Sequence, residues 1–148
     1  MTELCISVET DPAPADAETV RAGLLAFNVE RAGEPGTTFF AVLARDAEGS
    51  VAGGLLGWIA WEWLYVEKLW LPEALRGSGV GSRLLRAAEE HAVANGCRGV
   101  YLDTLEYQAR PFYERHGYEL YGVLEDFPPG FRKFHLRKRL APDPPPAA

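Results

Sequence analysis

The chain has 148 residues, of which 47% are hydrophobic and 24% charged, and its net charge is −6 at pH 7. This length fits one domain with a substantial core, and the composition lies far from that of disordered chains. The acidic balance argues against a nucleic-acid-binding protein, which needs a basic surface to displace counterions from phosphate. The sequence shows neither a leader nor an apolar run near the ~20 residues of a membrane helix, so we expect a cytoplasmic protein with no membrane partner.

Cysteine and histidine usage predicts neither a disulfide framework nor a metal site. Cys5 and Cys97 are the two cysteines, and we expect both to be reduced thiols. The histidines His91, His116 and His135 fall on separate predicted elements without ligand spacing. The sequence also lacks the nucleophile-elbow and Cys/His signatures of covalent catalysis.

The first part of the chain predicts a strand, an amphipathic helix and a hairpin. Breakers such as Pro12, and Gly49 with its freedom to adopt positive φ, separate these elements. In chain order we expect a strand at 4–8, a helix that begins at Asp16 as N-cap, a loop at 28–38 with room for a short helix, a strand at 39–45, a turn at 46–49 and a returning strand at 51–61.

The second part predicts a strand–helix–strand unit, in which the helix carries Val80, Leu84, Leu85, Ala88 and Ala92 on one face. In chain order we expect a tight bend near Glu62, a strand at 63–71 ended by Pro72, a helix at 79–95 capped by Gly96, a buried parallel strand at 100–104, a short helix at 108–116 closed by Gly117, and strands at 118–124 and 131–140. The last residues, 141–148, contain four prolines and predict a disordered tail. Residues 1–140 would then form a single domain.

A glycine-rich turn, Arg76-Gly77-Ser78-Gly79-Val80-Gly81-Ser82, lies between the strand at 63–71 and the following helix. A strand, a glycine turn and a helix N-terminus together bind phosphate, because free N–H groups and the positive end of the helix dipole point at one spot. The sequence lacks the Gly-Lys pair of a P-loop and only partly matches the dinucleotide fingerprint, which needs Gly at position 82. The pattern that remains is Arg/Gln-x-x-Gly-x-Gly/Ala, filled by Arg76, Gly79 and Gly81.

This pattern resembles the coenzyme-binding motif of the GNAT superfamily of acyl-CoA-dependent N-acyltransferases. A second segment, from Gln108 to Tyr118, is similar to another signature of that family through Ala109, Tyr113, Glu114 and Gly117. The resemblance extends from Asp16 to Leu140. It implies an α/β fold of the GNAT type: a mixed, mostly antiparallel sheet with one central parallel pair that splays open after Leu71, helices on both faces, and acetyl-CoA in the gap.

The resemblance also implies which residues bind the coenzyme. The backbone around Leu69 and Leu71 would hydrogen-bond the pantetheine arm, and an N–H there would stabilise an oxyanion. Gln108 would supply an amide near the position where the family often has Asn and this chain has Glu106. The pyrophosphate would bind to the seven residues of the glycine turn: Arg76, Gly77, Ser78, Gly79, Val80, Gly81 and Ser82.

Two residues are the candidates for proton transfer. The resemblance implies that Tyr113 protonates the departing thiolate; the alternative is an aromatic side chain that only packs on a core face. Glu67 would take the proton of an alkylamine, which is almost entirely charged at pH 7 because its pKa is near ~10.4. The alternative for Glu67 is a solvent-facing carboxylate paired with Lys68 or Arg76, and the sequence leaves both open.

We therefore expect an N-acetyltransferase that moves acetyl from acetyl-CoA to a small-molecule or peptide primary amine in a ternary complex, without a metal. Dimers are common among similar proteins, so a homodimer stays open. The first alternative is a non-catalytic acyl-CoA-binding sensor of the same fold. The second, a dinucleotide-binding domain, is disfavoured by the motif. The acceptor amine cannot be identified, because segments 27–38 and the bend near Glu62 carry no clear pattern.

Overall fold

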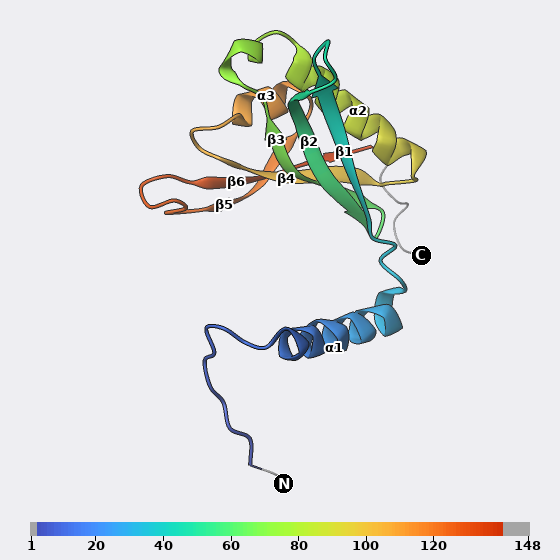
Figure 1. The fold of residues 1–148 in the computed structure, drawn as a ribbon, viewed down its shortest axis with the longest axis vertical. Helices are drawn as coiled ribbons and strands as arrows, with labels where there is room; N and C mark the ends of the chain where they lie inside the picture. Colours follow the sequence, from blue (N-terminus) through green and yellow to red (C-terminus); the bar gives the residue numbers. More distant parts are fainter. Residues whose placement is uncertain (1–2, 141–148) are drawn as a thin grey trace, which may run out of the picture. The chain divides into compact units, whose positions relative to one another are not determined.

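The structure is a computed structural model and describes residues 3–140 (Figure 1). Its contacts divide the chain into two compact units, one ending at Pro35 and the other beginning at Gly36. The predicted tail at 141–148 lies outside the described residues.

The N-terminal unit contains one helix, α1 (Pro14–Ala32). Pro14 stands in the first turn, where its fixed φ is already helical and its missing N–H is not needed. The helix ends at Gly33, whose φ is 82°. The N-cap is Ala13, so the predicted N-cap at Asp16 was three residues too late, and residues 28–32 of the predicted loop at 28–38 belong to the helix. The predicted strand at 4–8 was wrong: residues 3–9 form no ladder, and a short alternating run cannot stay extended as a strand without a neighbour to share its hydrogen bonds.

The second unit is built on a six-stranded sheet of order β1-β2-β3-β4-β6-β5. Its strands are β1 (Thr38–Arg45), β2 (Val51–Ala60), β3 (Trp63–Trp70), β4 (Gly99–Leu105), β5 (Glu119–Leu124) and β6 (Lys133–Arg139). Every neighbouring pair is antiparallel except β3 and β4, which are parallel. The predicted mixed sheet with one central parallel pair is confirmed.

Short turns join the first three strands. Between β1 and β2 the Asp46 carboxylate accepts hydrogen bonds from the backbone N–H groups of Glu48 at 3.0 Å and Ser50 at 2.9 Å. Between β2 and β3 the chain reverses at Trp61 and Glu62, which adopt positive φ angles of 46° and 61°. The bend expected near Glu62 is therefore present, although neither of its residues is a glycine.

Two helices of this unit, α2 (Val80–Ala94) and α3 (Arg110–Arg115), pack on the same face of the sheet (Figure 1). The parallel strands β3 and β4 are joined through a 3-10 turn, η1 (Glu73–Leu75), and α2. Burial follows the predicted apolar stripe of α2, whose buried members are Leu84, Leu85, Ala88 and Ala92. These side chains meet the fully buried Leu55, Leu64, Val100, Leu102 and Leu136 of the sheet.

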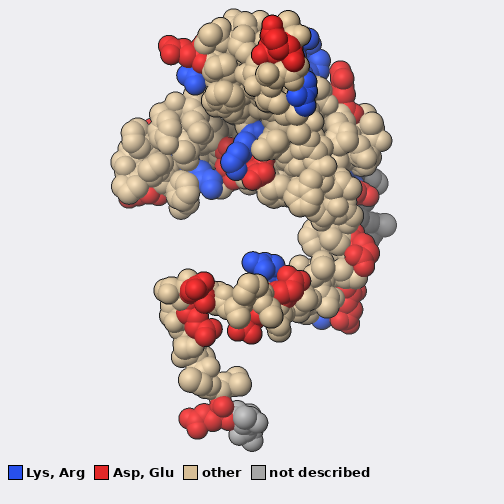
Figure 2. Space-filling model, viewed as in Figure 1, with Lys and Arg blue, Asp and Glu red and all other residues tan. Residues whose placement is uncertain are grey.

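The opposite face of the sheet carries a row of aromatic side chains. The Tyr65 ring lies 4.7 Å from that of Trp58 on β2 and 4.8 Å from that of Tyr101 on β4, measured between centroids. All three side chains are half-buried. In the view of Figure 2, acidic and basic side chains of this unit are scattered singly or in small groups over a largely uncharged surface.

None of the helices described between residues 3 and 140 is both long enough and apolar enough to cross a lipid bilayer. Within the same residues, no three His, Cys, Asp or Glu side chains come together in a way that could hold a metal ion.

Candidate active site

The glycine turn leads from β3 into α2, as expected. Gly77 and Gly79 both adopt positive φ, 74° and 87°, a backbone conformation that costs any other L-residue energy. A Cβ added at either position would meet no heavy atom within 4 Å. The two glycines are therefore required by the backbone conformation of the turn and not by crowding around it.

The N-terminus of α2 presents unpaired backbone donors. Gly79 is its N-cap, no side chain caps the helix, and the first turn contains no acidic residue. The first intrahelical bond runs from the Arg83 N–H to the Gly79 carbonyl at 3.1 Å. The N–H groups of Val80, Gly81 and Ser82 consequently have no acceptor within the helix, and the helix dipole adds positive potential there. This end of α2 has the geometry of an anion site.

Side chains of the turn brace its backbone. The Arg76 Nε donates to the Leu71 carbonyl at 3.1 Å, and the Ser78 hydroxyl donates to the Leu75 carbonyl at 2.5 Å. The Ser82 hydroxyl lies 2.9 Å from His116 Nε2, at the end of α3. This contact between α2 and α3 was not predicted, because nothing in the local sequence relates positions 82 and 116.

Strands β3 and β4 separate in the middle of the sheet. Their pairing ends at Val66 and Leu102, five residues before Leu71, where the sequence placed the splay. The earlier separation coincides with an irregularity: β2 pairs Gly57 with Val66 but Leu56 with Lys68, which leaves Glu67 as an extra residue in β3. A bulge of this kind bends its strand and increases its twist, which is the reason that the splay begins there. Leu69 and Leu71 lie beyond the point of separation, so their backbone edges toward β4 are outside the ladder.

The bulge places Glu67 on the side of the sheet opposite α2. Its carboxylate pairs with Lys68 Nζ at 3.0 Å, and 40% of its side chain is exposed. The structure thus contains the ion pair with Lys68 that the sequence left open, and it keeps the carboxylate in reach of solvent. Glu67 lies near enough to Tyr65 for its charge to contribute to raising the pKa of that phenol, although burial and Asp103 raise it more.

Tyr113 belongs to the core and is 6% exposed. Its ring lies against those of Phe112 and Tyr118, with centroids 5.1 and 5.8 Å away. Burial raises the pKa of Tyr113 to about 12, so the phenol keeps its proton at neutral pH. The hydroxyl is therefore a proton donor at neutral pH.

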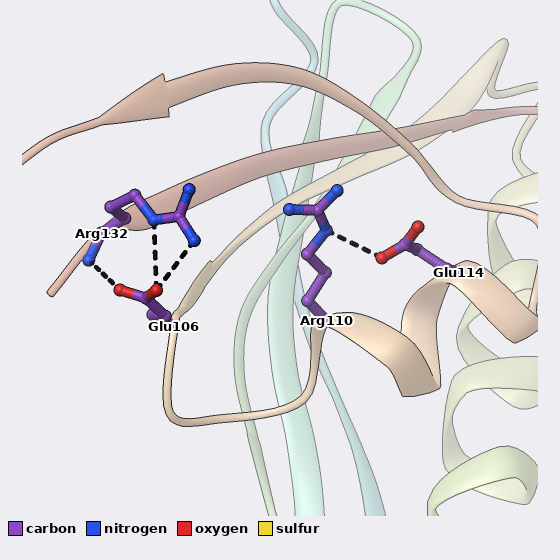
Figure 3. A network of polar contacts seen from close by, with 4 residues as sticks. All are labelled: Glu106, Arg110, Glu114 and Arg132. Carbon is purple, nitrogen blue, oxygen red and sulfur yellow. Dashed lines mark hydrogen bonds and ion pairs between the residues drawn. The ribbon is translucent and has the colours of Figure 1, made fainter.

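Gln108 and Glu106 close the end of β4. The Gln108 side-chain carbonyl accepts from the Leu105 N–H at 2.7 Å, which leaves its NH₂ group for another partner. Glu106 accepts from the Arg132 backbone N–H at 2.9 Å and from its guanidinium at 2.8 and 3.2 Å (Figure 3). Nearby, Arg110 Nε donates to Glu114 at 2.7 Å. Glu106, which stands where the family often has Asn, therefore ties the end of β4 to the segment that enters β6.

A polar cluster on the face opposite α2 was not predicted from the sequence. The Tyr65 hydroxyl donates to Asp103 Oδ2 at 2.8 Å, and His135 Nδ1 lies 2.5 Å from Asp103 Oδ1. His135 was set aside because it shares no local spacing with other polar residues. The register of β4 and β6, which pairs Asp103 with His135, is the signal that would have joined them.

Cys97 does not fit a covalent mechanism. It is 5% exposed, and burial together with the charge of Glu62 raises the pKa of its thiol, which opposes formation of the thiolate nucleophile. Cys5 is exposed and lies in the other unit.

These features define an α/β protein in which a strand–turn–helix arrangement suited to an anion lies beside a split pair of parallel strands. Residues 5–118 match the acetyltransferase (GNAT) family, and the chain belongs to this family of acetyltransferases. The resemblance noted in the glycine turn and around Tyr113 is thereby confirmed at the level of the family.

Individual relatives agree with this assignment. The chain is 41% identical over 134 residues to the acetyltransferase Atu2258 of Agrobacterium fabrum, covering 90% of this chain and 98% of that protein. It is 42% identical over 102 residues to the blasticidin-S acetyltransferase of Streptomyces morookaense, covering 68% and 75%. A solved acetyltransferase from Agrobacterium tumefaciens superposes with a TM-score of 0.82 at 40% identity, over 92% of this chain and 100% of that one. The protein is an acetyltransferase.

Proposed function

We propose that the protein transfers the acetyl group of acetyl-CoA to a primary amine by direct attack in a ternary complex. The observation that carries this proposal is the N-terminus of α2, where unpaired N–H groups follow a turn held open by Gly77 and Gly79. Acetyl-CoA carries a pyrophosphate, which fits donors of this kind. The seven residues Arg76–Ser82 would hold that pyrophosphate.

The split between β3 and β4 suits the rest of the coenzyme. An extended pantetheine arm can add to the edge of β3 beyond Val66, using backbone groups around Leu69 and Leu71 that have no partner in the ladder with β4. The free NH₂ group of Gln108 is available for a further contact. This path leads the thioester to the bulge at Glu67.

Two residues carry the proton transfers of the proposed reaction. Tyr113 donates a proton to the departing thiolate, supported by its place in the segment that resembles the second signature of the family and by a phenol that is protonated at neutral pH. Glu67 takes a proton from the incoming ammonium, directly or through water, supported by its exposed position at the bulge. The amine lone pair attacks the thioester carbonyl carbon, the new C–N bond forms, and the C–S bond breaks.

A screen for thiol release tests this proposal. The purified protein is given acetyl-CoA with a panel of amines: alkylamines, amino acids, peptides with free N-termini, and blasticidin S, which the name of one relative specifies as its substrate. We expect release above background with at least one amine, and its loss in Tyr113→Phe and Glu67→Gln. No release with any amine would remove the enzymatic proposal. Tight coenzyme binding by calorimetry in that case would favour the sensor module instead.

A further inference from the structure

Three strands each contribute one polar side chain to a cluster on the sheet face opposite α2. Tyr65 comes from β3, Asp103 from β4 and His135 from β6, and Asp103 contacts both of the others. The side chains of Asp103 and His135 are 22% and 30% exposed, so the pair is shielded without being sealed. We call these three residues the Asp103 cluster.

The hydrogen bonds of the cluster fix the tautomer of the imidazole. An ionised carboxylate only accepts, so His135 Nδ1 donates its proton to Asp103 Oδ1 and leaves the Nε2 lone pair free in the neutral ring. Burial, then the hydrogen bond to Asp103, raises the pKa of Tyr65, which keeps this hydroxyl a donor to Asp103 Oδ2. Asp103 is thus held from one side by Tyr65 while it orients His135 on the other. A carboxylate in this position also stabilises the imidazolium that forms when Nε2 accepts a proton.

The cluster lies at the place where the proposed thioester would arrive. Pairing of β3 with β4 stops at Val66 and Leu102, and the next residues along the two strands are Glu67 and Asp103. Both belong to the face opposite α2, because Tyr65 and Tyr101 two positions earlier stack on that face and side chains alternate along a strand. Asp103 therefore borders the first gap of the splay, and His135 is its directly paired neighbour on β6.

Other charged and titratable groups surround the imidazole. Lys133 and Arg137 stand two residues away on β6, and Lys133 Nζ lies 3.8 Å from Asp103 Oδ2. Tyr121 of β5 has its ring 6.0 Å from that of His135. Asp103 and Tyr101 of β4, with Tyr65 and Glu67 of β3, complete the face. Among the acidic groups, Asp103 is the one in direct contact with the imidazole.

The stoichiometry of the reaction calls for a second proton acceptor. A primary ammonium carries three protons and its amide product one, so the nitrogen loses two protons while the leaving sulfur gains one. Glu67 accounts for one of the two in the proposed function. It is tied to Lys68 and exposed, whereas His135 is oriented by a shielded carboxylate. A base held in this way is the better candidate for the proton released as the C–N bond forms.

We propose that His135 is a second catalytic base, which takes the proton of the attacking nitrogen at Nε2, and that Asp103 is its positioning residue. This inference rests on the proposed function. The C–N bond forms as the nitrogen proton moves to Nε2, and the C–S bond breaks as the thiolate takes the proton of Tyr113. Water then reprotonates Tyr113 and removes the proton from His135, and one proton is released overall when the acceptor enters as an ammonium.

The test compares variants with the panel amine that the wild-type protein acetylates with the highest kcat/KM. His135→Gln is expected to lower kcat/KM for the amine about 100-fold or more, the lower end of what a positioned base contributes, with the KM for acetyl-CoA unchanged. His135→Ala is expected to lower kcat/KM by a similar factor and to regain activity when free imidazole is added. A purely structural role of His135 would not give this recovery. Asp103→Asn is expected to lower kcat/KM less than the His135 variants do and to shift the acidic limb of the pH profile.

His91→Gln is the matched control, because this histidine lies on α2 against Phe40 and far along the chain from the cluster. Thermal unfolding and the Kd for acetyl-CoA are measured for each variant, so that a folding defect is separated from loss of a base. Wild-type kcat/KM in His135→Gln would overturn this inference and leave the proposed function standing. The same holds if folded His135→Ala loses activity and free imidazole does not restore it. Absence of wild-type turnover with every amine would instead overturn the proposed function.

Discussion

Substitution of Gly79 by alanine tests the glycine turn most directly. Gly79 has φ of 87°, and a Cβ there would meet nothing within 4 Å, so alanine adds conformational strain without a clash. An L-residue in this region costs about 1–2 kcal/mol. Residues 76–79 are exposed, so in the absence of coenzyme the turn can relax to avoid the strain, and the energy then opposes binding.

At tenfold per 1.4 kcal/mol, this strain corresponds to an increase of about 5- to 30-fold in the Kd for acetyl-CoA. Calorimetry on the purified variant measures this constant, and initial rates give the matching rise in KM. Gly79→Asn should recover much of the affinity, because asparagine tolerates the left-handed region better than alanine. Kcat with saturating coenzyme should change little.

Gly96 provides the control at the other end of the same helix. It too has positive φ, 72°, with nothing within 4 Å of an added Cβ. Gly96→Ala should lower the free energy of unfolding by about 1–2 kcal/mol and leave the Kd for acetyl-CoA unchanged. If Gly79→Ala bound acetyl-CoA as tightly as the wild type, or if both alanine variants weakened binding equally, the assignment of the turn to the coenzyme would be refuted.

Three further predictions concern the acid, the β4–β6 tie and the core. Tyr113→Phe should lower kcat by about 100-fold or more at unchanged stability. Burial raises the pKa of Tyr113 to about 12, so the wild-type pH profile should lose this acid near pH 12 and not near the ordinary tyrosine pKa of 10.0. Hydrogen bonds from Arg132 lower the pKa of Glu106 in the folded protein, so Glu106→Gln should be less stable than the wild type at pH 7. The stability difference should vanish as the pH falls through the folded pKa of Glu106, which lies below the ordinary carboxylate range. Urea titrations of both proteins over a range of pH measure this difference. Leu85 is fully buried, and Leu85→Ala should cost about 2–5 kcal/mol of unfolding free energy in the same assay.

Local signals in the sequence were sufficient for the elements that position the proposed coenzyme site. The apolar stripe of α2, the glycines before it and Gly96 after it all act within a few residues, and the structure has the helix at Val80–Ala94. The same holds for the hairpin, where Asp46 and Gly49 specify the turn between β1 and β2. The parallel placement of β4 followed from its nearly continuous apolar run.

Features that depend on pairing between distant strands were not predictable in this way. The run from Leu4 to Val8 has strand-like alternation, yet no strand forms there, because alternation does not supply a neighbour. The splay was placed five residues too late because the bulge at Glu67 is visible only in the register with β2. Asp103 and His135 are 32 residues apart, and only the β4–β6 ladder joins them.

The bulge itself depends on a glycine that takes no part in the chemistry. A Cβ on Gly57 would come within 2.2 Å of the Tyr65 carbonyl oxygen and 3.0 Å of the Phe40 ring, so β2 can approach β3 at this point only because the residue has no side chain. That close approach fixes β3 between Tyr65 and Glu67, immediately before β4 turns away. Tyr65 is thereby held against Asp103, while Glu67 is left at the opening of the gap. The position of Glu67, the first proposed proton acceptor, is consequently set by the backbone packing of β2 on β3.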